Sequence, residues 1–214
     1  YRITNNSGLF DPTYYQTQLT KPLSSGQDPL VHFLTTDVET RADPHPLFDT
    51  AYYLTQCPDV AEQGINPLVH YLATGAETRA DPHPLFNQTF YCAQGLINGV
   101  KNETPLAHFL RIGCHKNIDP HPLFDSSFYL DKYPDVAKQG INPLLHFLQT
   151  GWLEGQSPHP LFDAPYYLDR YPDVAEQGIN PLLHFIRFGL EEKRQCHLLF
   201  DADYYTKQNP DAVA

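Results

Sequence analysis

The chain has 214 residues and a formal net charge of -11, because 25 Asp and Glu residues outnumber 14 Lys and Arg residues. This acidic balance argues against binding to the nucleic-acid backbone or to anionic lipid, since both need a basic surface. Hydrophobic residues make up 41% of the chain and aromatic residues 13%, which favours packed structure over disorder. The longest apolar runs are far shorter than the roughly 20 residues of a membrane-spanning helix.

A Leu-Phe pair recurs every 38 residues along the chain, which is typical of a tandem repeat protein. The pair begins at Leu9, Leu47, Leu85, Leu123, Leu161 and Leu199. From the second pair on, it lies in a His-Pro-Leu-Phe-Asp motif or a close variant, here called the joint, which begins at His45, His83, His121, His159 and His197. One unit is too small to bury a core alone, so we expect neighbouring units to stack. The predicted organisation is a single repeat array over 1–214, with units at 9–46, 47–84, 85–122, 123–160 and 161–198 and a partial unit at 199–214.

The first helix of each unit is predicted to follow the joint directly. In the unit 47–84, Asp49 is a good N-cap, and Phe48 and Tyr53 have the spacing of a hydrophobic staple. This helix should run over residues 50–56, because Cys57 precedes a proline. Asn87, Asp125 and Asp163 hold the place of Asp49 in later units.

Two further helical segments are predicted before the next joint. Residues 58–63 favour a short helical turn, which Gly64 closes in the left-handed conformation. Asn66 followed by proline then predicts the start of another helix, over about 67–74, with apolar residues at i, i+3 and i+4. Gly75 ends that helix, and a polar, proline-rich connector leads to the next unit.

These elements predict an all-α fold, in the form of an α-solenoid of 38-residue helical hairpins joined by proline-rich connectors. Nothing in the chain alternates in the manner of a β-strand. The third unit departs from the pattern, with Leu96-Ile97-Asn98 where other units have Pro-Asp-Val.

Ten of the eleven histidines fall in two repeat positions. One set begins the joints, and the other lies on the second helices at His32, His70, His108, His146 and His184. A ladder of metal sites is one interpretation, but equivalent positions in stacked helices lie roughly 8–10 Å apart, too far to share one ion. The favoured interpretation is structural, with each ring donating to a backbone carbonyl.

The structural role extends to the rest of the joint, where the apolar residues staple the next helix and the Asp or Asn caps it. The residues predicted to form these joints are His45, Phe48, Asp49, His83, Phe86, Asn87, His121, Phe124, Asp125, His159, Phe162 and Asp163.

The four cysteines leave two interpretations open. None lies in a Cys-x-x-Cys pair, which argues against a cysteine zinc site. They fit occasional small buried residues. Alternatively, Cys57 and Cys92 lie on the first helices of adjacent units and could form a disulfide, which would imply an oxidising location.

A pair of aromatic residues follows each joint, as at Tyr52-Tyr53. Such rings could stack on sugars, but adjacent helical positions point about 100° apart, so at least one ring of each pair should be core. The chain has no nucleophile motif, phosphate loop, paired catalytic carboxylates or nucleotide fingerprint. We therefore predict no enzyme activity, no catalytic residue and no cofactor.

The segment Pro160 to Phe185 carries the repeat in its clearest form, PLFDAPYYLDRYPDVAEQGINPLLHF. It resembles a tandem repeat of bacterial proteins, cyanobacterial ones included. It is similar to segments of large secreted proteins related to hemolysin-type calcium-binding proteins, and to segments beside polysaccharide-biosynthesis glycosyltransferases. The resemblance covers nearly the whole chain, and it implies no catalytic residue.

The sequence thus predicts a non-catalytic structural or protein-interaction module of a bacterial surface or secreted protein. Its expected partner is protein, either itself or other repeats, in end-to-end assembly into a filament. The expected location is extracellular or at the cell surface. Two alternatives are a carbohydrate-binding or glycosyltransferase-associated module, which would bind polysaccharide, and a metal-binding histidine array.

Overall fold

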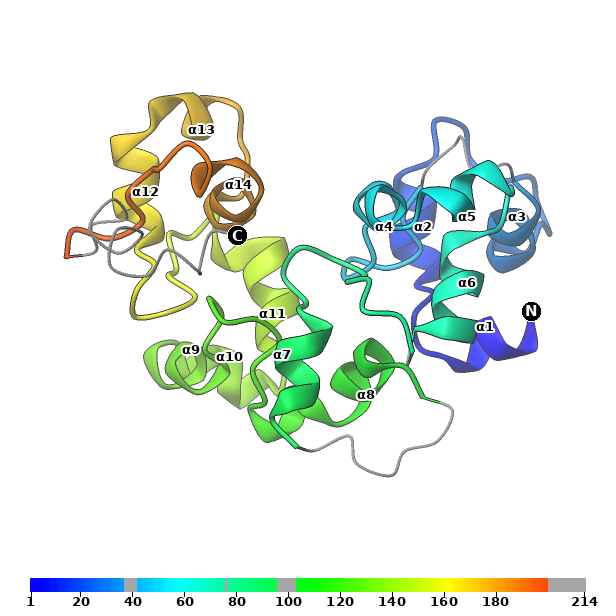
Figure 1. Cartoon of the computed structure of the whole chain (residues 1–214), viewed down its shortest axis with the longest axis horizontal. Helices are drawn as coiled ribbons and strands as arrows, with labels where there is room; N and C mark the ends of the chain where they lie inside the picture. Colours follow the sequence, from blue (N-terminus) through cyan, green and yellow to red (C-terminus); the bar gives the residue numbers. More distant parts are fainter. Residues whose placement is uncertain (37–41, 76, 96–102, 200–214) are drawn as a thin grey trace. The chain divides into compact units, whose positions relative to one another are not determined.

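The computed structural model describes residues 1–36, 42–75, 77–95 and 103–199 (Figure 1). The chain divides into two compact parts, an N-terminal block, Tyr1–His121, and a C-terminal block, Pro122–Ala214. The division falls at the predicted boundary between the third and fourth repeat units. The unusual residues Leu96-Ile97-Asn98 and nearly all of the partial unit at 199–214 lie outside the described residues.

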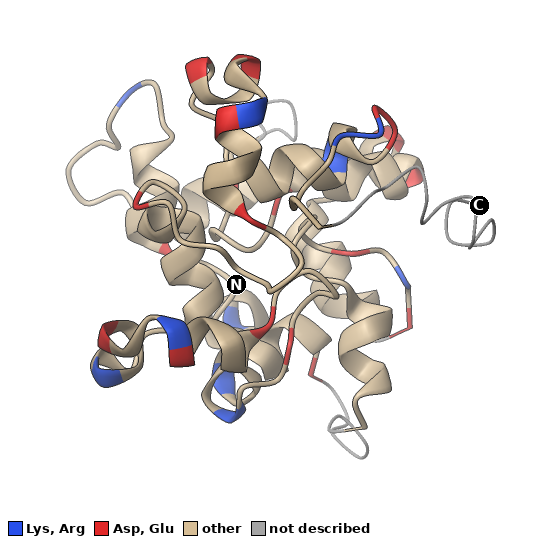
Figure 2. Cartoon of the chain, turned by 90° about the vertical axis from the view of Figure 1, so that its left-hand side faces the viewer, with Lys and Arg blue, Asp and Glu red and all other residues tan. Residues whose placement is uncertain are grey.

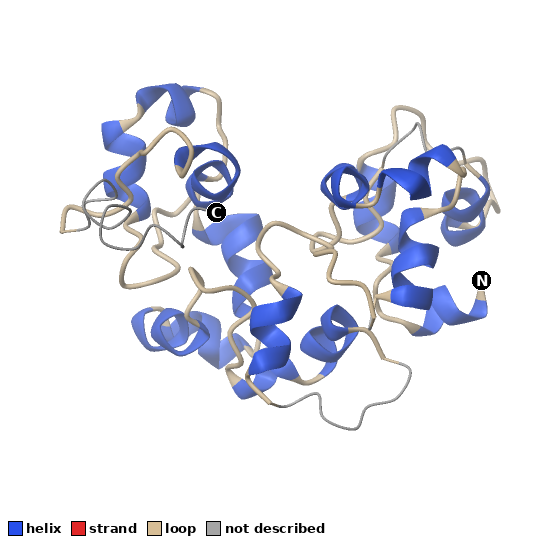
Figure 3. Ribbon diagram, viewed as in Figure 1, coloured by secondary structure: helices blue, strands red, loops and turns tan. Residues whose placement is uncertain are grey.

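Short helices joined by loops build the described part of the N-terminal block (Figure 3). In chain order they are α1 (Arg2–Asn6), α2 (Pro12–Thr17), α3 (Pro29–Thr35), α4 (Thr50–Gln56), α5 (Pro58–Glu62), α6 (Pro67–Thr74), α7 (Gln88–Ala93), α8 (Pro105–Arg111) and the 3-10 helix η2 (Gly113–Lys116). The three helices predicted within 47–84 are confirmed as α4, α5 and α6.

The C-terminal block contains two units, and each repeats the order of helices seen in α4, α5 and α6. They are α9 (Ser126–Lys132), α10 (Pro134–Gln139), α11 (Pro143–His146), η3 (Phe147–Gly151), α12 (Ala164–Arg170), α13 (Pro172–Glu176), α14 (Pro181–His184) and η4 (Phe185–Gly189). The segments η3 and η4 are π-helical continuations of α11 and α14. In the view of Figure 2, Lys and Arg are interspersed among Asp and Glu along the described chain.

The predicted helix signals act as expected in the unit 47–84. The Asp49 carboxylate accepts a hydrogen bond from the Tyr52 amide at 2.8 Å, and the Asn66 side chain accepts from the first amides of α6. Gly64 has a φ of 65°, in the left-handed region where a side chain is strained. Local chemistry therefore fixes where these short helices begin and end.

The core consists mainly of aromatic rings from the joint and the two longer helices of each unit. In the unit 47–84, the ring centroids of Phe48 and Tyr53 lie 5.4 Å apart, and Tyr71 meets Tyr53 edge to face at 5.8 Å. All three rings are fully buried. Each such ring pair contributes about 0.5–1.5 kcal/mol beyond the burial of its area. The all-α prediction is confirmed, and the stacking of units into a solenoid stays a prediction.

Replacing the cap residue Asp49 with alanine should lower the free energy of unfolding by about 1 kcal/mol, because the Tyr52 amide loses its acceptor. Urea unfolding followed by far-UV circular dichroism measures the change. Asp59→Ala is the matched control, since this exposed aspartate lies in the first turn of α5 and is not its N-cap. Equal losses in the two variants would contradict the assignment of Asp49 as the cap.

Candidate functional site

The joints at His45, His83 and His159 are tight turns that their own histidines close. In the joint at His45, the Phe48 amide donates to the His45 carbonyl at 2.8 Å, and the Leu47 amide donates to His45 Nδ1 at 3.0 Å. The same bond to Nδ1 forms at His83, His159 and His197. The Nδ1 atom accepts a backbone N–H here, a bond that the sequence did not predict.

Burial explains why this nitrogen is free to accept. His45 is 8% exposed, and burial lowers its pKa to about 4, an effect that the nearby Asp11 carboxylate opposes. At neutral pH the imidazole is therefore uncharged. A neutral ring has one unprotonated nitrogen, which suits the Leu47 amide.

One backbone hydrogen bond connects each joint to the next. The Asp49 amide donates to the Pro82 carbonyl at 2.8 Å, directly before the joint at His83. The same bond recurs as Asp11 to Pro44, Asn87 to Pro120, Asp125 to Pro158 and Asp163 to Cys196. The cap residue thus fixes the start of its own helix and holds the following joint.

Tyrosine–histidine pairs connect the two longer helices of every described unit. The Tyr53 hydroxyl lies 2.8 Å from His70 Nδ1, and the partners are 17 residues apart in the chain. The other pairs are Tyr15–His32, Tyr91–His108, Tyr129–His146 and Tyr167–His184, at 2.8–2.9 Å. Burial raises the pKa of each of these tyrosines, so the hydroxyls stay protonated and keep the hydrogen bond. All five second-helix histidines are thereby committed to internal hydrogen bonds.

A glutamine clamp closes the connector of the unit 47–84. Gln56 donates from Nε2 to the Asp81 carbonyl at 2.9 Å and accepts from the Asp81 amide at 3.0 Å. Gln18 and Gln94 make the same pair of bonds in their own units. The sequence did not predict this clamp, although the glutamines recur with the 38-residue spacing of the repeat.

The C-terminal block closes its connectors with tyrosine. The Tyr133 hydroxyl accepts from the Ser157 amide at 2.8 Å, and the Tyr171 hydroxyl accepts from the Gln195 amide at 2.7 Å. Tyr133 and Tyr171 stand one position after the place that glutamine holds in the N-terminal block. A glutamine in the N-terminal block and a tyrosine in the C-terminal block therefore accept a hydrogen bond from the same position of the connector.

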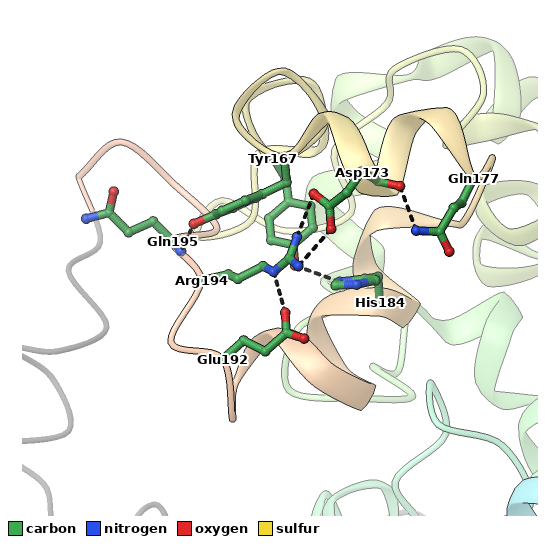
Figure 4. A network of polar contacts seen from close by, with 8 residues as sticks. Tyr167, Asp173, Gln177, His184, Glu192, Arg194 and Gln195 are labelled. Atoms are coloured by element: carbon green, nitrogen blue, oxygen red, sulfur yellow. Dashed lines mark hydrogen bonds and ion pairs between the residues drawn. The ribbon is translucent and has the colours of Figure 1, made fainter.

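Arg194 adds an ionic network to the last complete unit (Figure 4). Its guanidinium makes two hydrogen bonds with Asp173, at 2.8 and 3.0 Å, and a further one with Glu192. It also lies over the Tyr171 ring, 4.7 Å from the centroid. The Arg194 side chain is 17% exposed, and its hydrogen bond lowers the pKa of the Asp173 carboxyl. The network lies beside Tyr167 and His184. The Arg194 guanidinium is bonded to carboxylates of the protein itself, so it is not free to bind a ligand.

The cysteines are free thiols, Cys57 and Cys92 included, in contrast to the disulfide considered from the sequence. Cys57 lies between α4 and α5 and is partly buried beside the Tyr53 hydroxyl, whereas Cys92 is exposed on α7. They occupy repeat positions three residues apart, so their side chains meet different surroundings. Burial raises the pKa of the Cys196 thiol to about 11, which makes it a poor nucleophile.

Metal and sugar sites receive little support from the geometry. Among the described residues, no group of three or more His, Cys, Asp or Glu side chains could hold a metal ion. The second ring of each described aromatic pair is buried, and the first ring, as in Tyr52, is partly buried. The first rings are the part of this pattern left accessible to a partner.

No protein family, curated protein or solved structure matches the chain. Within the described residues, no helix is long and apolar enough to cross a membrane. The fold and the site define an all-α protein whose repeated polar residues bond to one another. The resemblance to bacterial tandem repeats stays a prediction from the motif.

Proposed function

We propose that this chain is a non-catalytic structural and protein-interaction module of a bacterial surface or secreted protein, which assembles end to end. One observation carries the proposal. The histidines, aspartates and buried tyrosines that recur in each unit are occupied in holding the joints and helices together. Groups that an enzyme would need free are used to stiffen the repeat.

Bonds of this kind suit a rigid spacer. The joints at His45, His83 and His159 each combine a turn, a helix cap and, at the cap residue, a backbone bond to the segment before the next joint. Mechanical stiffness in a repeat protein comes from such nearest-neighbour contacts. A heterologous contact between ends, which does not close on itself, then extends the array into a filament.

Concentrated protein should therefore form elongated particles that negative-stain electron microscopy can image. Light scattering on the same samples should show a mass that rises with concentration. A mass equal to one chain at every concentration, with no elongated particles, would contradict end-to-end assembly.

Polysaccharide is the alternative partner, favoured by the partly buried first ring of each aromatic pair. Rings such as Tyr14, Tyr52 and Tyr166 keep part of their surface exposed on the first helices. A glycan array probed with the intact chain tests this alternative. Binding that disappears in Tyr52→Ala and Tyr166→Ala would support it, whereas an array with no binder would remove it.

A further inference from the structure

Two neighbouring units depart from the repeat at three positions that lie far apart in the sequence. In the unit 47–84, Tyr71 stands where the other complete units have phenylalanine, as Phe33, Phe109, Phe147 and Phe185. In the unit 85–122, Gln88 stands where the other units have Pro, Thr, Ser or Ala, and Thr104 replaces the Asp or Asn that caps the other second helices. The structure brings these three departures together within the N-terminal block.

The Tyr71 hydroxyl lies between the other two departures. It donates to Gln88 Oε1 at 2.9 Å and accepts from the Leu106 amide at 3.2 Å. Leu106 lies two residues after Thr104, in the first turn of α8. Tyr71 and Leu106 are fully buried, and Gln88 and Thr104 are 3% and 5% exposed. A single hydroxyl group therefore joins α6 of one unit to the first turns of α7 and α8 in the next.

The identity of Thr104 explains why the Leu106 amide needs that hydroxyl. At α3, α6, α11 and α14, the side chain of an Asp or Asn cap accepts from two amides of the first turn. The shorter Thr104 side chain accepts from the Ala107 amide, at 3.4 Å, and leaves the Leu106 amide to Tyr71. Residues of two units therefore cap α8 jointly.

Gln88 bonds to the preceding unit with both ends of its amide. Its Nε2 donates to the Ala80 carbonyl, in the connector of the unit 47–84, while its Oε1 accepts from Tyr71. Burial raises the pKa of Tyr71, and hydrogen bonds from the Leu106 amide and Thr104 oppose this shift. The hydroxyl keeps its proton at neutral pH and therefore remains the donor to Gln88.

We propose that Tyr71, Gln88 and Thr104 determine which units pair at this junction, and we call these three residues the junction key. A preceding unit with phenylalanine in place of Tyr71 would leave Gln88 Oε1 and the Leu106 amide without these partners. A following unit with an Asn cap and a small residue in place of Gln88 would leave the Tyr71 hydroxyl without its acceptor. A buried polar group without a partner destabilises the folded chain, so each wrong pairing is disfavoured.

A key of this kind counters a hazard of repeated sequences. Units that share the joint and the helix signals can pair out of order, which is a characteristic misfolding route of repeat proteins. The junction key fixes the order of the units 47–84 and 85–122 through groups that the other units lack. This inference concerns recognition between units of one chain, and it holds whether or not chains assemble end to end.

A cycle of full-length variants tests the key by imitating the wrong pairings. Tyr71→Phe changes the first unit, and Gln88→Ala with Thr104→Asn gives the second unit residues that other units have at these places. In the wild-type background, Tyr71→Phe should raise the equilibrium constant for unfolding at least about tenfold. In the Gln88→Ala/Thr104→Asn background the same change should lower that constant, because it removes a buried hydroxyl that has lost its acceptor. Urea unfolding followed by far-UV circular dichroism gives the constants.

Tyr53→Phe is the matched control, since Tyr53 is also fully buried and its hydroxyl bonds His70 within one unit. Its effect should be the same in both backgrounds. An equal effect of Tyr71→Phe in both backgrounds, or no effect in the wild type, would overturn the key. If Tyr71→Phe alone prevents folding, the triple variant should still fold, and a triple variant that is also unfolded would overturn the key.

Hydrogen exchange measured by NMR locates the effect at the Leu106 amide. Tyr71→Phe should speed exchange of this amide at least about tenfold. Adding Thr104→Asn should slow it again, because an asparagine accepts here as Asn66 accepts from the Leu68 amide. The Leu68 amide is the internal reference, and its rate should change less than that of Leu106. Unchanged exchange at Leu106 in Tyr71→Phe would show that Tyr71 does not cap α8 and would overturn the key.

Discussion

Gly151→Ala should lower the free energy of unfolding of the C-terminal block by about 3 kcal/mol. A Cβ atom on Gly151 would lie 2.1 Å from the Tyr129 hydroxyl, closer than side-chain atoms can approach. That hydroxyl cannot move away freely, because it bonds His146 Nδ1 at 2.9 Å and also donates to Gln156. The added methyl group must break the tyrosine–histidine pair or displace the helix that holds it.

Trp152 provides the measurement, since it is the only tryptophan of the chain and directly follows Gly151. Its fluorescence during urea unfolding reports the stability of this block. Gln149→Ala, an exposed change two residues away, should cost less than about 0.5 kcal/mol.

A second substitution separates a steric clash from a general loss of helix structure. Tyr129→Phe alone should cost about 1 kcal/mol through its lost hydrogen bonds. In the Gly151→Ala background it removes the clashing oxygen, so the two costs should not add, and we expect a favourable coupling of about 1–2 kcal/mol. Additive costs would show that the Tyr129 hydroxyl is not what requires glycine at this position.

Acid should destabilise the joint at His45 by about 3 kcal/mol between pH 6.5 and pH 4. Above pH 6.5 the ring is neutral in both the folded and the unfolded chain, so the joint keeps its full stability. As the pH falls below 6.5, the unfolded chain binds a proton while the buried ring, with its pKa of about 4, does not. Stability therefore falls across this window and levels off below pH 4.

His45→Asn should remove this part of the pH dependence. An asparagine Oδ1 can accept the Leu47 amide in the manner of an Asx turn, and it does not titrate. His115→Asn is the control, because His115 is exposed on η2. Chemical unfolding at several pH values, followed by circular dichroism, gives the free energies. If wild type and His45→Asn lose stability equally between pH 6.5 and pH 4, the buried imidazole is not responsible.

Helix boundaries could be read from the sequence because their signals are local. Asp49 caps α4, Pro58 separates it from α5, and Gly64 takes the left-handed conformation, all within a few residues of where they act. The same locality made the joints predictable as structural elements. The recurrence every 38 residues strengthened each signal by repetition.

The partners of the polar side chains could not be read in this way. Tyr53 and His70 meet across 17 residues, and Gln56 reaches Asp81 across 25. The 38-residue repeat shows that these residues recur at equivalent positions, but it does not show which positions contact each other. The direction of the His45 bond was also hidden, since it depends on burial that makes the ring neutral.

The sequence by itself determined the all-α class, the helix ends and the joint, because caps, prolines and glycines act on their immediate neighbours. Only the tertiary structure decided what the histidines do and why Gly151 must lack a side chain, because both depend on rings that packing brings from another helix. The same holds for the exposed joint leucines. The same motif leaves its leucine fully buried at Leu47 and 50% exposed at Leu161, a difference that no local signal predicts.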